Sequence, residues 1–227
     1  MKVVLIGKGR LGTQLYGVLK SRCDLQWFGR DFPTSIQADL VIVSISDAET
    51  IKVCDSIDAS FVVHTAGGLE LLKNENSGVF YPLYSFSKEA EVDWPQVPFL
   101  IETKKNKHLP ILKEIVRIIG AKYYPITSEQ RTKLHAAAVM VNNFTNHLYT
   151  LAKEHCEAYE LPFEILHAIM RQGPEKAIEV GPEKAQTGPA SRGDDSTIEA
   201  HLNQINNLKT RELYKLLSES IHKRNEL

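Results

Sequence analysis

The feature that most constrains this chain is a glycine pattern, Gly7-x-Gly9-x-x-Gly12, placed directly after the apolar run Lys2–Ile6. A continuous apolar run is typical of a strand buried on both faces. Apolar residues at helical spacing follow over 11–19 and predict a helix. In a strand–turn–helix unit, the first glycine permits a tight turn, the second lets the backbone approach a pyrophosphate, and the third lets helix and strand pack closely. The pattern predicts dinucleotide binding; the alternative is a glycine-rich turn without a ligand.

Further cofactor contacts are predicted at the ends of the next buried strands, Ala38–Ile45 and Ser60–His64. Ligands in open α/β sheets bind at the carboxyl ends of the strands. The predicted cofactor-binding residues are Gly7, Gly9, Arg10, Leu11, Gly12, Arg30, Ser44, Ile45, Ser46, Thr65 and Ala66.

The choice between NADP and NAD depends on the end of the second strand, Leu25–Phe28, which is followed by Arg30 and Asp31. Arg30 can hold a 2′-phosphate through a charge-assisted fork, and Arg10 offers a second contact. Asp31 is the opposing signal, because an acidic residue there favours NAD. We predict NADP in preference to NAD.

The strand signals stop near Pro125, so the chain divides into an α/β part and an all-α part. Before that point the pattern predicts an aromatic loop over 81–86, a strand over 98–102, a helix over 109–119 and a last strand over 122–125. Thr127 and Gln130 have the spacing of a capping box, which predicts the start of a long helix over 128–159. Further helices are predicted over 162–171, 174–180, 195–208 and 210–223, with Gly-Pro-Glu-Lys-Ala at 173–177 and 181–185 marking two helix starts. The prediction is a doubly wound, mainly parallel domain over 1–125 and a helical domain over 126–227.

Composition excludes several classes of protein. Lys plus Arg number 27 and Asp plus Glu 28, a net charge of −1, without the basic excess of a nucleic-acid or polybasic membrane-surface protein. No apolar run reaches the length of a membrane span. The first strand begins at once, leaving no room for a signal peptide. Three widely spaced cysteines form no metal motif. We expect a cytoplasmic protein that uses no metal.

These motifs resemble the 6-phosphogluconate-dehydrogenase-like reductases, which include pyrroline-5-carboxylate reductase and ketopantoate reductase. They are more similar still to a bacterial subgroup of Rossmann-like proteins with a C-terminal helical domain of unknown function. The segments that carry the resemblance are 7–12, 64–67, 81–86, 98–102, 135–139 with Asn143, and 187–194. The resemblance implies a Rossmann domain followed by a helical domain, and an NADP-dependent oxidoreductase of unspecified substrate.

The reacting groups cannot be carried over directly, because the catalytic Lys with Asn four residues later in the β-hydroxyacid dehydrogenase relatives is absent. Lys133 is followed four residues on by Ala137. We therefore predict His135, Asn143 and His64 as catalytic residues, since a histidine can exchange protons near neutral pH. The alternative for either histidine is a structural one. Glu102, Asn142 and Arg192 are the predicted substrate-binding residues.

Three hypotheses follow for function. The first is an NADP-dependent oxidoreductase that transfers hydride between nicotinamide and a small carbonyl, imine or hydroxy-acid substrate in a cleft between the domains. The second is a non-catalytic NADP-binding regulator or sensor, and the third a structural dimerisation protein. The long helix carries apolar residues around much of its circumference, and we expect it to form a two-fold homodimer through the helical domain.

Overall fold

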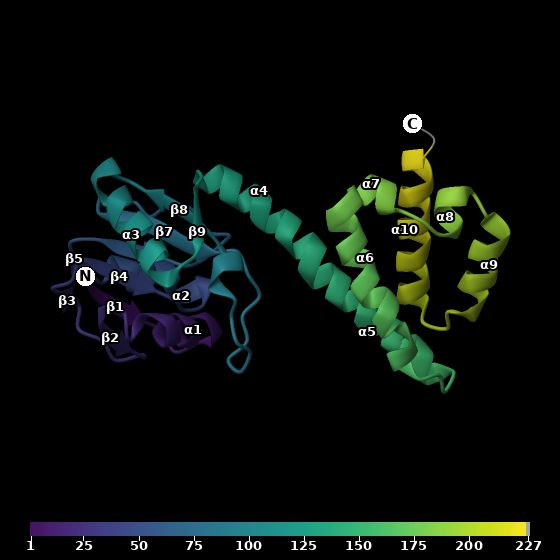
Figure 1. Ribbon diagram of the computed structural model, residues 1–227, viewed down its shortest axis with the longest axis horizontal. Helices are drawn as coiled ribbons and strands as arrows, with labels where there is room; N and C mark the ends of the chain where they lie inside the picture. Colours follow the sequence, from purple (N-terminus) through teal and green to yellow (C-terminus); the bar gives the residue numbers. More distant parts are fainter. Residues whose placement is uncertain (226–227) are drawn as a thin grey trace. The chain divides into compact units, whose positions relative to one another are not determined.

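The computed structural model describes residues 1–225, and the chain divides into two compact units, Met1–Val141 and Asn142–Leu227. Figure 1 shows the first unit as a sheet with surrounding helices and the second as helices alone. This arrangement confirms the predicted fold class, a Rossmann domain followed by a helical domain. The predicted boundary at residue 125 coincides with the end of the last strand and stays a prediction, since the compact units divide sixteen residues later.

The first unit is built on a seven-stranded sheet in the order β2-β1-β4-β6-β7-β8-β9. Its strands are β1 (Lys2–Ile6), β2 (Asp24–Phe28), β4 (Leu40–Val43), β6 (Val62–His64), β7 (Ser77–Pro82), β8 (Pro98–Thr103) and β9 (Lys122–Pro125). All neighbouring strands are parallel except β7 and β8. A separate parallel pair joins β3 (Ser35–Ile36) to β5 (Asp58–Ala59). Because β2 and β4 lie on opposite sides of β1, the chain reverses direction across the sheet at β1, where ligands of such folds bind.

Alternation along the central strands divides the core between the two faces of the sheet. In β1, Val3 and Leu5 pack with α1 (Arg10–Leu19) and α3 (Leu109–Ile119). Val4 and Ile6 pack on the other face with α2 (Asp47–Asp55). All four are buried, and burial of each such side chain contributes about 1.5–3 kcal/mol. The continuous apolar runs are therefore two interleaved faces, as predicted for strands covered on both sides.

The prediction of a loop over 81–86 is wrong at its start, because Tyr81 and Pro82 end strand β7. This strand was missed since Gly78 and Pro82 interrupt the apolar pattern. Pro82 is tolerated at the last position of the strand, where a missing N–H costs little.

The long predicted helix over 128–159 is present but not uniform. It consists of α4 (Ser128–Ala138), a π-helical segment (Val139–Phe144) and α5 (Thr145–Ala158). The capping box of Thr127 and Gln130 starts it, as predicted. Apolar side chains along it are exposed in the single chain, including Val141 at 75% and Phe144 at 58%.

The second unit contains η4 (Phe163–Leu166), α6 (His167–Val180), α7 (Pro182–Ala185), α8 (Pro189–Arg192), α9 (Asp195–Gln204) and α10 (Leu208–Asn225). Helix α10 packs against α8 and α9 (Figure 1). The prediction of a new helix at Pro174 is wrong, because this proline lies inside α6. Gly181, with φ of +87°, ends α6, and Pro182 begins α7. The second copy of the repeated motif does therefore begin a helix.

Candidate functional site

The three glycines after β1 occupy the three distinct environments that a phosphate-binding turn requires. Gly7 has φ of +118°, and a Cβ there would lie 1.9 Å from the carbonyl oxygen of Ser44. A Cβ on Gly12 would lie 2.3 Å from the carbonyl oxygen of Gly7, so helix α1 packs on the turn without a side chain between them. A Cβ on Gly9 would have no neighbour within 4 Å. The structure thus needs Gly7 and Gly12 for packing, and leaves open space at Gly9 through which a ligand can reach the backbone.

The N-terminus of α1 is suited to an anion. Gly9 is its N-cap and has no side chain to accept hydrogen bonds from the first-turn N–H groups, and the first turn contains no acidic residue. The N–H groups at Arg10, Leu11 and Gly12 therefore keep the partial positive charge of the helix end. The Leu11 side chain packs on the core. Only its backbone N–H is therefore available to a ligand. A pyrophosphate fits this arrangement.

The far side of the turn carries an exposed cation that the sequence did not single out. Lys8 extends over the ring of Trp27 in β2, with Nζ 5.1 Å from the ring centroid. Trp27 is fixed in turn, because Nε1 donates to the carbonyl oxygen of Gly7 at 2.8 Å and its ring stacks on Tyr16. Arg30 and Asp31 are exposed just beyond the same strand. No local pattern predicts the place of Lys8, since it depends on a tryptophan nineteen residues later.

The strand-end residues predicted to border the cofactor lie at the carboxyl ends of β4 and β6. Ser44 is buried against the glycine turn, and its N–H donates to the carbonyl oxygen of Ile6 at 2.8 Å. Ile45 is half-buried and Ser46 exposed as the N-cap of α2. The Thr65 N–H donates to the carbonyl oxygen of Val43 at 3.2 Å. Ala66 follows it and is buried.

His64 is held by its own loop. It is completely buried; Nδ1 accepts a hydrogen bond from the Ala66 N–H at 3.2 Å, and Nε2 lies 3.2 Å from the carbonyl oxygen of Glu70. Burial lowers the pKa of His64 to about 4, with a further lowering from the charge of Arg131. A neutral ring with both nitrogens engaged shapes the 64–70 loop, and we leave His64 out of the proposed reacting groups.

Glu102 takes part in a buried ion pair at the start of α4. Its Oε2 lies 2.5 Å from Nη1 of Arg131, a side chain with no exposed surface. Its two oxygens also accept from the N–H and the hydroxyl of Ser128, at 2.9 and 2.8 Å. Nη2 of Arg131 donates to the carbonyl oxygen of Leu69 in the loop after β6. Glu102 thus fastens the first turn of α4 to the sheet, and the sequence did not identify Arg131 because its partners are distant along the chain.

His135 lies one turn further along α4 and faces the sheet. Its Nδ1 is 3.0 Å from the hydroxyl of Tyr81, at the end of β7. Tyr81 is half-buried, and the structure brings it to His135 across fifty-four residues.

Comparisons with known proteins agree with this geometry. Residues 97–221, more than half of the chain, match the family described as a domain of unknown function, DUF2520. The chain belongs to the DUF2520 family. No match was found among curated proteins.

Solved structures extend the likeness over nearly the whole DUF2520 chain. A candidate NADP oxidoreductase from Bacteroides fragilis is 33% identical, with a TM-score of 0.87 and 98% of both chains covered. A protein from Thermotoga maritima is 22% identical, with a TM-score of 0.77 over 99% of this chain and 98% of that one. An imine reductase from Myxococcus stipitatus in complex with NADP⁺ is 10% identical, with a TM-score of 0.63 over 98% and 92%. The predicted Rossmann-like protein with a C-terminal domain of unknown function is confirmed by the family match and the Bacteroides structure, and the other two structures show that their fold is shared.

The other predicted substrate residues belong to the second unit of the DUF2520 protein. Asn142 and Asn143 lie in the π-helical segment, where Nδ2 of Asn142 is 3.5 Å from Oδ1 of Asn143. Arg192 is exposed at the end of α8. The neighbouring Asp194 caps α9 by accepting from the Thr197 N–H and hydroxyl. The roles of Asn142 and Arg192 in binding substrate, and of Asn143 in catalysis, stay predictions.

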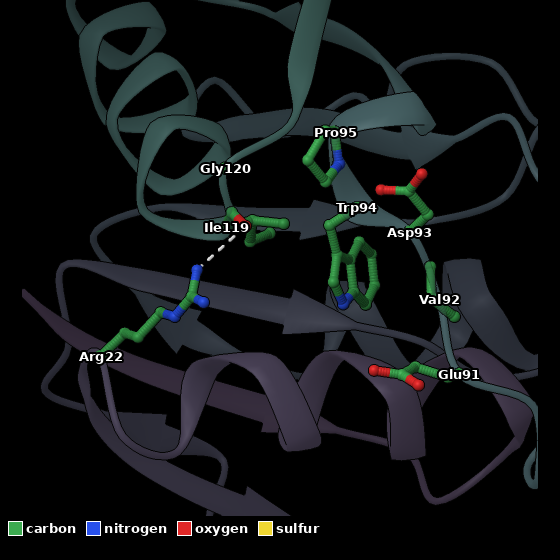
Figure 2. Close-up of a pocket in the computed structure, with 8 residues that line it drawn as sticks. All are labelled: Arg22, Glu91, Val92, Asp93, Trp94, Pro95, Ile119 and Gly120. Atoms are coloured by element: carbon green, nitrogen blue, oxygen red, sulfur yellow. Dashed lines mark hydrogen bonds between the residues drawn. The ribbon is translucent and has the colours of Figure 1, made fainter.

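A pocket of about 570 Å³ in the first unit lies between Arg22, the segment 91–95 and the end of α3 (Figure 2). It lies beside Arg22, which precedes β2, and Gly120, which precedes β9. Arg22 donates from Nη1 to the carbonyl oxygens of Ile118 and Ile119, at 2.8 and 3.0 Å, and so caps the end of α3. The residues that line this pocket do not include those of the glycine turn, so we treat it as a separate feature.

Within residues 1–225, no group of three or more His, Cys, Asp or Glu side chains is arranged to hold a metal ion. Across the same residues, no helix combines the length and apolar character needed to cross a membrane.

Proposed function

We propose that this protein is an NADP-dependent oxidoreductase that transfers a hydride between the nicotinamide ring and a small carbonyl, imine or hydroxy-acid substrate. The observation that carries the proposal is the glycine turn between β1 and α1. Its two crowded glycines, its one open glycine and the uncapped helix end together fit the pyrophosphate of a dinucleotide. When bound, the cofactor supplies the hydride. The protein binds and orients cofactor and substrate and transfers the proton.

NADP is favoured over NAD by the charges around the turn. Lys8, Arg10 and Arg30 are all exposed there, and an additional 2′-phosphate offers two negative charges for them to contact. Asp31 opposes this preference but stands against three cations. We assign the 2′-phosphate to Arg30 first, with Lys8 and Arg10 in support.

Proton handling is assigned to His135 and the Tyr81 hydroxyl bonded to it. Both lie near the edge of the sheet at which β4 and β6 end. His135 is half-buried, so its ring can exchange protons with water as well as with Tyr81.

The non-catalytic regulator remains the second candidate because of Lys133. The relatives with a catalytic Lys–Asn pair use a lysine of the long helix for chemistry; here Lys133 has no Asn four residues later and pairs with Glu129 at the surface at 2.6 Å, with three-quarters of its side chain exposed. A protein that only senses NADPH needs the glycine turn but no reacting groups.

Turnover separates the two candidates. Wild-type protein with NADPH is offered a panel of 2-oxo acids, cyclic imines and simple ketones, and the oxidation of NADPH is followed by its absorbance. Substrate-dependent oxidation supports the reductase. NADPH binding with no oxidation across the panel favours the regulator, and the variant Gly9→Asp, which blocks the turn, is the matched negative control.

We further propose a homodimer through the helical unit. Large apolar side chains are exposed there in the single chain, among them Ile165, Ile169 and Ile178 at 72, 63 and 86%. A second copy is the partner that a two-fold oligomer of one chain provides, and burial of these side chains would stabilise it.

A further inference from the structure

The structure brings together Tyr81, His135 and Gly67. None of the three is among the predicted cofactor-binding residues. Tyr81 comes from the end of β7, His135 from α4, and Gly67 from the turn after β6. The Tyr81 hydroxyl lies 3.0 Å from Nδ1 of His135, and the two rings meet edge to face with centroids 5.9 Å apart. The hydrogen bond fixes the phenol oxygen relative to the imidazole.

Gly67 lies in close contact with both Tyr81 and His135. A Cβ there would lie 2.7 Å from Nδ1 of His135, 2.7 Å from Cζ of Tyr81 and 2.9 Å from its hydroxyl. Strands β6 and β7 are parallel, so Gly67 and Tyr81 lie at the same carboxyl edge of the sheet. The Tyr81 hydroxyl and the His135 ring therefore lie at the carboxyl edge of the sheet, where ligands of this fold bind.

The support beneath His135 is rigid. Arg131 precedes it by four residues, on the same face of α4. Its guanidinium is fully buried and bonded to Glu102 of β8 and to the loop after β6. A side chain placed one turn from so fixed an anchor has little freedom to leave its partner, which is what a reacting group requires.

The phenol is held in its protonated form. Burial raises the pKa of Tyr81 above its ordinary value, the carboxylate of Asp47 on α2 adds to the rise, and the charge of Arg131 opposes it. Tyr81 thus carries its proton at neutral pH and has an imidazole at hand to restore it.

We propose that Tyr81 gives the proton to the substrate, and that His135 is the positioning residue that holds the phenol and returns its proton. The proposal rests on the proposed function. As the hydride forms a bond to the carbon of a C=O or C=N group, the π electron pair moves to the heteroatom. The heteroatom takes the proton from Oη of Tyr81. The phenolate then takes a proton from Nδ1 of His135, and the ring regains one from water.

The first test needs no substrate. Protein labelled with ¹³Cζ-tyrosine is titrated with pH by NMR, and the Tyr81 signal is identified by its loss in Tyr81→Phe. If Tyr81 faces the reacting ring, the positive charge of the NADP⁺ nicotinamide should lower the Tyr81 midpoint by about one pH unit or more. Bound NADPH, whose ring is neutral, and 2′-phospho-ADP-ribose, which lacks the ring, should not produce this drop.

Two failures of this test have different meanings. NADP⁺ that binds without moving the Tyr81 midpoint overturns the role of Tyr81 and leaves the proposed function standing. NADP⁺ that does not bind removes the proposed function and this inference together. His135→Leu should also move the Tyr81 midpoint in the folded protein, whereas an unchanged midpoint would show that His135 does not position the phenol.

The second test uses a compound from the panel that the wild-type protein reduces. Tyr81→Phe should lower kcat by about 10²-fold or more with NADPH affinity unchanged, because the phenyl ring keeps the packing and removes only the proton. Tyr84→Phe is the matched control, since Tyr84 is nearby in sequence and 48% exposed, and it should retain the wild-type rate. A folded Tyr81→Phe variant with full kcat would overturn the proposal.

Discussion

The two units of this chain differ in how many of their apolar side chains they bury. In the first unit, sixteen hydrophobic residues form one buried cluster and nine form another, on the two faces of the sheet. In residues 142–224, over which burial is described, only Cys156, Ala190 and Ile205 are buried. The first unit therefore has the core of an independent domain, whereas the second leaves its largest apolar side chains in contact with solvent.

This difference teaches where to look for each kind of function. A rigid, well-packed sheet can hold a cofactor turn and reacting side chains in fixed geometry. Helices with exposed apolar faces are suited to assembly, because their burial is completed by another surface. The cofactor site is accordingly proposed in the first unit and the dimer contact in the second.

The largest effect is expected from polar substitutions on the exposed face of α6 and the segment before it. Ile165→Asp with Ile169→Asp should weaken the dimer by at least about 100-fold, since each isoleucine contributes about 1.5–3 kcal/mol when buried and both copies lose it. Ile51→Asp, at a 50% exposed position on α2 of the first unit, is the control and should leave the dimer intact. Sedimentation velocity reads both, and a monomeric wild type at micromolar concentration would contradict the assignment.

The next effect concerns the anchor of α4. Arg131→Ala leaves the Glu102 carboxylate without its buried partner and should lower the free energy of unfolding by about 3–5 kcal/mol. Lys133→Ala, which breaks the exposed pair with Glu129 on the same helix, should cost at most about 1 kcal/mol. Urea denaturation compares the two variants; similar losses would show that the buried pair is not the anchor described above.

A smaller, selective effect is expected at the cofactor corner. Arg30→Ala should weaken NADPH binding by about 1.5–3 kcal/mol and NADH binding far less, because only NADPH carries the 2′-phosphate. Arg192→Ala, an exposed arginine of the second unit, should leave both cofactor affinities unchanged. Fluorescence titration measures the four combinations, and equal losses for NADPH and NADH at Arg30 would remove its assigned role.

Buried His64 should make the first unit sensitive to acid. Burial lowers the pKa of His64 from 6.5 to about 4, so between these values the unfolded chain binds a proton that the folded chain does not. Stability is thus complete above about pH 6.5 and falls as the pH drops toward 4, with a loss of roughly 2 kcal/mol at pH 5. His64→Gln should flatten this part of the curve in urea denaturation at several pH values; an unchanged slope would mean that other groups cause it.

The parts of the fold that were predictable are those where local pattern and tertiary environment agree. The runs around Val4 and Ile42 are apolar at every position because both sheet faces are covered, and the glycine turn carries its geometry in its spacing. Thr127 and Gln130 cap α4 through contacts between residues only three positions apart in sequence. Each of these signals is complete within a few residues of sequence.

The parts that were missed depend on partners far along the chain. The ion pair of Glu102 with Arg131 and the bond of Tyr81 to His135 join separate strands to α4. Pro174 was misread because Gly173 keeps a negative φ and lets the helix continue, whereas Gly181 does not. Nothing in the residue types marks the two glycines as different.

The central claim, that the first unit holds a nicotinamide dinucleotide at the glycine turn, is tested most directly by calorimetric titration of NADPH into wild type and Gly9→Asp. A Cβ at Gly9 has no neighbour within 4 Å, and aspartate is a favourable N-cap, so the variant should keep the wild-type melting temperature. Its carboxylate would occupy the uncapped N–H groups and repel the phosphates. We predict one NADPH per chain with micromolar affinity for wild type and a loss of about 100-fold or more in the variant. Equal NADPH binding by both proteins, or none by wild type, would contradict the account.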